Sequence, residues 1–140
     1  MRLTKTRYVA AALFAVVVGR GHMQAHHAFA AEFDATKEVT MTGTVAEMQW
    51  VNPHSWLYIN VTNAEGKEER WGFEFGPPNA LFRRGWTRST VPPGMKVTVV
   101  AFLATDGRKV ASAKTVKLPD GRSLFAGSEG TGAPTDAPSK

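Results

Sequence analysis

Apolar residues recur at every second position in several short stretches between residues 39 and 118 of this chain. This period is typical of β-strands that bury one face. The first stretch runs from Val39 to Trp50, and its apolar positions change parity between Gly43 and Glu47. One extra residue in a strand produces such a change, so we expect a β-bulge that bends this strand.

Two further strands are predicted at residues 57–61 and 71–75, and the Glu65-Gly66 turn joins them into a hairpin. Residues 95–103 and 110–118 have the same period and predict two more strands. The hairpin is separated from these last strands by a segment with a different pattern.

That segment, Asn79 to Trp86, is predicted to form a helix of at most two turns, because Asn79 suits its start and Gly85 its end. Five strands with a helix between the third and the fourth predict an all-β fold with one short helix, a small OB-like five-stranded barrel. The bent first strand favours this fold, since so small a barrel shares one strand between its two layers. A small β-sandwich is the alternative.

The strand pattern also predicts which side chains fill the interior. Residues of one parity on each strand should face a common core. The residues expected there are Val45, Leu57, Ile59, Val61, Phe73, Val97 and Val99, with Trp71 and Phe75 on the Phe73 face.

The amino-terminal stretch has the pattern of an export signal. Three basic residues stand in the first seven positions, and an uncharged run covers residues 8–19. This run is too short for a membrane span, which needs roughly 20 apolar residues. We expect cleavage after Ala25, with cleavage after Ala30 as the alternative, and therefore a periplasmic or secreted protein without a membrane anchor.

These boundaries divide the chain into four parts. Residues 1–25 are the cleaved signal, residues 26–38 an amino-terminal segment, and residues 39–125 the OB-like barrel domain. Residues 126–140 are rich in Gly, Ser, Ala, Thr and Pro and have too little apolar surface to offset their ordering entropy. We expect a flexible tail there.

Composition narrows the chemistry. The chain has no cysteine, which excludes disulfides, thiolate zinc sites and iron–sulfur ligation. Its 17 Lys and Arg exceed its 12 Asp and Glu, but four of the basic residues leave with the signal. The mature chain is therefore close to neutral, and nucleic acid is not expected as a partner.

Four parts of the sequence together resemble a family of small exported bacterial proteins known as domain of unknown function 6152. They are HHAFAAEFD at 26–34, GTV at 43–45 with WVNPH at 50–54, PNALFRRGWT at 78–87, and DGR at 120–122. The resemblance implies a periplasmic or secreted single domain. It implies no activity, because none is established for the family.

Histidine is the residue type whose placement suggests chemistry. After cleavage at Ala25, His26 would carry a free α-amine beside its imidazole, and His27 or His54 could supply a further imidazole. Such a set of nitrogen ligands suits Cu(II), so copper is the candidate cofactor. The alternative is that His26 and His27 belong to a frayed terminus and that His54 only forms hydrogen bonds within its loop.

Two further groups of residues are candidates for ligand binding. Aromatic side chains at Trp56 and Tyr58 have the parity opposite to Leu57 and Ile59 and could bind sugars or bases beside the loop that contains Asn52. The alternative is that they only pack on the barrel.

A basic pair, Arg83 and Arg84, stands beside Trp86 and could bind an anionic ligand. The alternative is a solvated helix end. Neither paired carboxylates nor a Gly-x-Ser-x-Gly motif supports catalysis, so we do not expect an enzyme. The sequence favours an exported binding protein of unknown ligand, with a copper carrier or buffer as the first hypothesis. The alternative is an envelope interaction or scaffold module that binds a sugar polymer or a partner protein.

Overall fold

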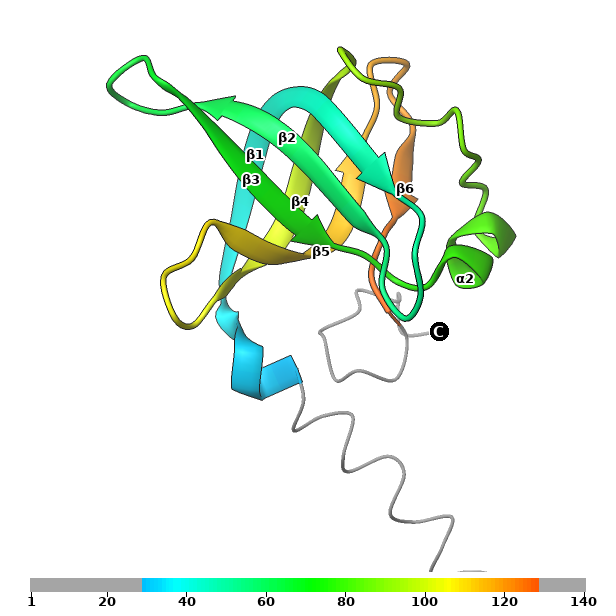
Figure 1. Cartoon of the computed structure of the whole chain (residues 1–140), viewed down its shortest axis with the longest axis horizontal. Helices are drawn as coiled ribbons and strands as arrows, with labels where there is room; N and C mark the ends of the chain where they lie inside the picture. The colour runs from blue at the N-terminus through cyan, green and yellow to red at the C-terminus, as the bar shows by residue number, and fades with distance from the viewer. Residues whose placement is uncertain (1–28, 129–140) are drawn as a thin grey trace, which may run out of the picture.

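The computed structural model describes residues 29–128, whose strands wind into a small closed barrel (Figure 1). One turn of helix at residues 29–32 leads directly into the first strand. The elements are β1 (Phe33–Gln49), β2 (Trp56–Thr62), β3 (Glu68–Glu74), α2 (Pro78–Arg83), β4 (Lys96–Ala104), β5 (Val110–Lys117) and β6 (Ser123–Phe125).

Five of the strands form a ring. The sheet order is β3-β2-β1-β4-β5-β6, and an additional parallel pairing of β3 with β5 closes it. All other pairs are antiparallel. With α2 between β3 and β4, this is the predicted OB-like arrangement, and β6 is a short sixth strand at the edge of β5.

The long strand β1 takes part in both layers of the barrel. Its first half pairs with β4 and its second half with β2, and the register with β2 shifts between Val45 and Glu47. This is the predicted β-bulge. A Cβ atom on Gly43 would lie only 2.4 Å from the Asn60 carbonyl oxygen, so the strands approach here as only glycine allows.

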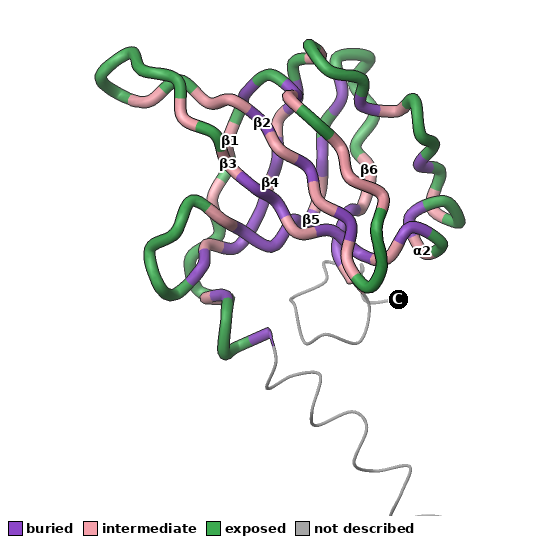
Figure 2. The backbone as a smooth tube through the Cα atoms, in the orientation of Figure 1, coloured by how far each residue is buried: buried purple, intermediate pink, exposed green. Residues whose placement is uncertain are grey.

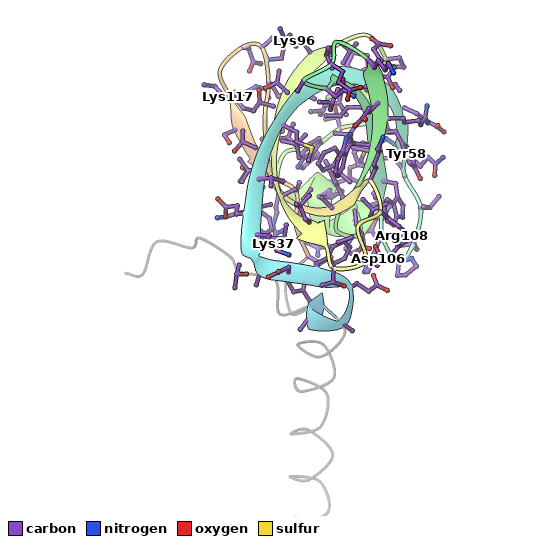
Figure 3. All side chains as sticks on the ribbon, turned by 90° about the vertical axis from the view of Figure 1, so that its left-hand side faces the viewer. Lys37, Tyr58, Lys96, Asp106, Arg108 and Lys117 are labelled. Atoms are coloured by element: carbon purple, nitrogen blue, oxygen red, sulfur yellow. The ribbon has the colours of Figure 1, made fainter. Side chains whose placement is uncertain are left out.

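The interior is filled by alternate residues of the ring strands, as the purple segments of Figure 2 show. Viewed along the ring in Figure 3, the side chains fill its centre, while the labelled Lys96, Lys117 and Tyr58 point outward. The predicted core is confirmed for most of its members. The buried ones are Val45, Leu57, Ile59, Phe73, Phe75, Val97 and Val99, and the partly buried ones packed against them are Val61 and Trp71.

The barrel begins earlier than its hydrophobic pattern predicts. β1 starts at Phe33, six residues before Val39, because Phe33 packs in a second small cluster with Phe29, Phe102 and Ala104. The intervening residues 35–38 are exposed, so the two-residue period does not mark this part of the strand.

The other end of the described chain also packs on the barrel. Ala126 is fully buried, and its N–H donates to the Lys114 carbonyl while its own carbonyl accepts from the Gly76 N–H. Residues 126–128 of the predicted tail are thus held against the ring, and the rest of that tail lies outside the described residues. Among the described residues, no helix is long and apolar enough to cross a membrane.

Candidate functional site

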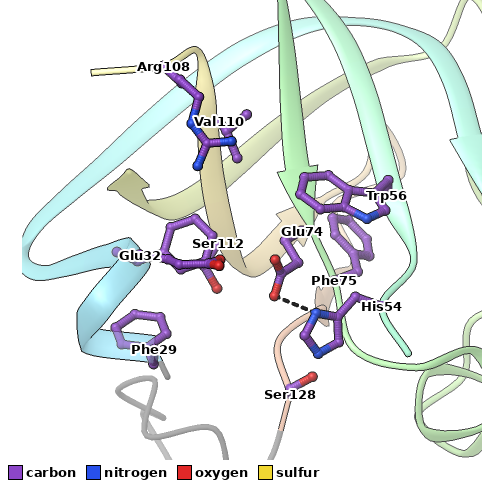
Figure 4. A pocket seen from close by; sticks show the side chains of 11 residues that line it. Phe29, Glu32, His54, Trp56, Glu74, Phe75, Arg108, Val110, Ser112 and Ser128 are labelled. Atoms are coloured by element: carbon purple, nitrogen blue, oxygen red, sulfur yellow. Dashed lines mark ion pairs between the residues drawn. The ribbon is translucent and has the colours of Figure 1, made fainter. Parts of the chain in front are cut away.

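A pocket of about 470 Å³ lies at one end of the barrel, where the helical turn before β1 faces the start of β2 and the end of β3 (Figure 4). Its apolar walls are Phe29, Phe33, Trp56, Phe75 and Val110. Its polar lining comes from Glu32, His54, Glu74, Arg108, Ser112 and Ser128. Aromatic rings and ionisable groups therefore meet in one small volume, which is typical of small-molecule and cofactor sites.

The closest polar contact in this pocket joins His54 to Glu74. The His54 Nδ1 lies 2.8 Å from Oε1 of Glu74, and the two side chains are 35% and 15% exposed. The Nε2 atom of His54 forms no hydrogen bond within residues 29–128 and points away from Glu74 in Figure 4. One ring nitrogen is thus fixed by a carboxylate, and the other is left for a ligand.

The β2–β3 hairpin places these two side chains together. Trp56 pairs with Glu74 in the ladder, and beyond it the Ser55 N–H donates to the Gly76 carbonyl while the Phe75 N–H donates to the Ser55 carbonyl. These bonds extend the β2–β3 pairing to the residues just before β2 and just after β3. His54 is therefore held beside the end of β3.

Partial burial changes the acidity of Glu74. Loss of hydration raises the pKa of this carboxyl, the nearby charge of Glu32 raises it further, and His54 acts in the opposite direction. The carboxyl of Glu74 therefore favours either a proton or a positively charged neighbour.

The predicted aromatic pair lies partly at the pocket. The rings of Trp56 and Tyr58 stack with centroids 6.4 Å apart and planes 20° apart, and both residues are half-buried. Arg70 lies over Tyr58, with its Cζ 4.7 Å from the ring centroid. Of the two aromatics, Trp56 lines the pocket, while Asn52 is exposed in the preceding loop and does not line it.

Trp86 was predicted as a ligand-binding residue, and its position argues against that role. Only 2% of it is exposed, its Nε1 donates to the Phe125 carbonyl at 2.8 Å, and its ring packs edge-to-face on Phe75. A buried indole with its N–H bonded has no face left for a ligand. Trp86 is a core residue.

The basic residues beside Trp86 also lie outside the pocket. Arg84 donates to the Gly127 carbonyl at 3.2 Å and lies over the Phe125 ring at 4.3 Å, so it holds the segment after β6. Arg83 is exposed at the end of α2. The structure therefore does not bring these arginines together with His54 or Trp56.

Of the three predicted metal ligands, only His54 belongs to the part of the chain that the structure describes. His54 is in the pocket, whereas His26 and His27 lie outside the described residues. Within residues 29–128, no group of three His, Asp or Glu side chains could hold a metal ion. A metal at His54 would therefore need ligands from another part of the chain.

Glu74 and Ser112 were not predicted as site residues from the sequence. For Glu74, the predicted hairpin register could have indicated its position. The predicted hairpin centred on Glu65-Gly66 sets Glu74 opposite Trp56, next to His54. Ser112 reaches the pocket through the parallel pairing of β3 with β5, in which it is the partner of Glu74. That pairing joins distant strands and leaves no local pattern.

The closed five-stranded ring, with a polar and aromatic pocket at one end, places the chain in the class of small OB-like β-barrels. The chain belongs to the family of unknown function DUF6152, whose sequence model matches residues 15–113. No curated protein and no solved structure matches the chain.

Proposed function

We propose that this chain is an exported binding protein that binds Cu(II) through its mature amino terminus and His54, as a copper carrier or buffer in the periplasm or medium. The contact between His54 and Glu74 carries the proposal. Histidines that bind metals typically donate their second ring N–H to a carboxylate, which fixes the tautomer and the ring orientation. Glu74 can do this for Nδ1, so that Nε2 is the ligand atom.

The position of Phe29 supports a role for the amino terminus. Phe29 lines the pocket and follows His26 by three positions, so their α-carbons are at most about 11 Å apart. If the mature chain begins at His26, its α-amine and imidazole start within a short reach of the pocket.

The chemistry of these ligands favours copper. The set consists of an amine and imidazoles, the chain has no cysteine, and Cu(II) prefers tetragonal nitrogen ligation and heads the divalent affinity order. Because two of the proposed ligands are at the terminus, the copper site depends on where the signal is cleaved.

Titration of Cu(II) into protein that begins at His26 tests this function. We expect acetylation of the His26 α-amine, and separately replacing His54→Ala, each to weaken binding at least tenfold, because each removes one proposed ligand group. Lys67→Ala, which changes an exposed side chain at the tip of the β2–β3 hairpin, is the control and should bind normally. Equal affinity in all four proteins would leave only nonspecific binding to imidazoles.

A second candidate function is an envelope interaction module that binds a sugar polymer or a partner protein. It is favoured by the stack of Trp56 on Tyr58, whose side chain points outward from the barrel in Figure 3, since flat aromatic faces suit sugar rings. We expect Tyr58→Ala to abolish retention of the protein on purified cell-wall glycan, with Arg88→Ala as the control. Unchanged retention of the Tyr58 variant, or no retention of the unaltered protein, would reject this function.

A further inference from the structure

Ser112 presents an unused hydroxyl to the pocket. The residue is only 8% exposed, lies on β5 and lines the pocket, and its hydroxyl makes no hydrogen bond within the described residues. Because Ser112 lines the pocket, its hydroxyl is available to a ligand there as a hydrogen-bond donor or acceptor. A bound ligand with a polar group at this point would provide the missing partner.

Two carboxylates face the same space without a bonded lysine or arginine. Glu74 comes from β3 and Glu32 from the helical turn before β1, and within residues 29–128 neither forms an ion pair with Lys or Arg. Arg108 also lines the pocket, but its Nε already donates to Asp106. The pocket therefore has an excess of negative charge.

The walls around these carboxylates are aromatic. Trp56 and Phe75 lie on one side, and Phe29 lies across the pocket beside Glu32 (Figure 4). Aromatic faces attract cations and also pack against the apolar body of a ligand. The pocket volume of about 470 Å³ is in the range of small-molecule sites.

We propose that this pocket binds a small organic cation, a primary ammonium group on an aromatic or branched apolar body. The ammonium lies between Glu32 and Glu74, and its third N–H is accepted by the Ser112 hydroxyl, so that all three donors of the group have partners. The apolar body packs against Trp56 and Phe75. This inference goes beyond the copper function and does not depend on it.

The first test compares three probes of the same shape and different charge. Benzylammonium, benzyl alcohol and benzoate are titrated into the exported protein, after removal of metal by a chelator, and binding is followed by calorimetry. We expect benzylammonium to bind at least tenfold more tightly than benzyl alcohol, and benzoate to bind most weakly. Equal binding of the alcohol, tighter binding of benzoate, or no binding of benzylammonium would overturn the proposal.

The second test uses variants that preserve shape. Glu32→Gln removes one charge at an exposed position and should weaken benzylammonium at least fivefold, and Ser112→Ala should weaken it about threefold. Glu68→Gln, an exposed carboxylate at the other end of β3, is the matched control and should have no effect. Circular dichroism checks that each variant is folded. Unchanged benzylammonium affinity in folded Glu32→Gln would contradict the assignment.

Discussion

At the scale of single residues, the pocket depends on how Glu74 is surrounded. Its side chain is 15% exposed, and its one close polar partner among the described residues is His54. Burial removes part of the hydration that stabilises the charged carboxylate, and the contact with His54 offsets part of this loss. This combination orients the His54 ring and also makes Glu74 sensitive to pH.

Glu74→Gln should change the pH dependence of stability. Burial raises the pKa of this carboxyl in the folded state above its ordinary value of 4.5. Above that value the folded protein holds the proton more often than the unfolded chain, so the contribution of Glu74 to stability falls as the pH rises. The free energy of unfolding of Glu74→Gln, relative to the unaltered protein, should therefore increase between about pH 4 and 6.

Urea unfolding of the metal-free proteins at several pH values measures this difference. The matched control is Glu68→Gln, since Glu68 is exposed on the same strand. A difference that stays constant over this range, or that decreases, would show that Glu74 is not held in a poorly hydrated position.

A second residue-scale prediction concerns Trp86. Trp86→Phe keeps an aromatic ring in the core but leaves the Phe125 carbonyl without its donor. We expect a loss of stability of about 2 to 4 kcal/mol from the unmade hydrogen bond and the smaller ring together. Trp50→Phe, at a half-buried ring whose N–H has no partner within residues 29–128, should cost less in the same denaturation experiment.

At the scale of elements, the sequence predicts those features that leave a mark on the local pattern of apolar and turn residues. The parity change between Gly43 and Glu47 reveals the bulge, because side chains on the two sides of a bulge face opposite ways. The Glu65-Gly66 turn reveals the hairpin. β6 escapes prediction because it is three residues long and none of them is fully buried, so its strand character depends on pairing with β5.

Contacts between distant elements could not be read from the sequence. The parallel pairing of β3 with β5 brings Ser112 to Glu74, and the helical turn brings Glu32 to the same pocket. Each depends on the closure of the whole ring. The interpretation of Trp86 as a ligand residue was wrong for a related reason: its N–H is bound by the Phe125 carbonyl of β6, a strand that the sequence did not predict.

Gly43→Ala tests the bend of β1. The new Cβ would meet the Asn60 carbonyl oxygen at 2.4 Å, so the backbones of β1 and β2 would have to separate. We expect a loss of roughly 1 to 3 kcal/mol of stability, as for other overpacked sites, in chemical denaturation. Thr44→Ala, at an exposed neighbouring position of the same strand, is the control. Equal stability of the two variants would show that β1 tolerates a wider spacing at the bulge.

At the scale of the whole molecule, the pocket collects residues from both ends of the described chain. Phe29 and Ser128 both line it, together with the ends of the central strands. Any change at the start of the mature chain therefore occurs close to the pocket. The proposed copper site therefore depends on the proposed cleavage after Ala25, which would place the new amino terminus close to the pocket.

Mass spectrometry of the exported protein gives that position. We expect a mature chain that begins at His26, because Ala25 stands at a suitable distance from the apolar run at residues 8–19. A chain that begins at Ala31 would lack His26 and His27 and would reject the proposed copper site. The polar groups of the organic-cation pocket, Glu32, Glu74 and Ser112, would all be present, but the pocket would lose its Phe29 wall.

Pulsed electron paramagnetic resonance of Cu(II) bound to protein that begins at His26 tests most directly whether the terminus and His54 share one metal ion. Modulation from the remote nitrogens of coordinated imidazoles reports how many imidazoles bind the copper. We predict at least two in the unaltered protein and one fewer in His54→Ala. Identical modulation in the two proteins would contradict a copper site that joins the amino terminus to the barrel.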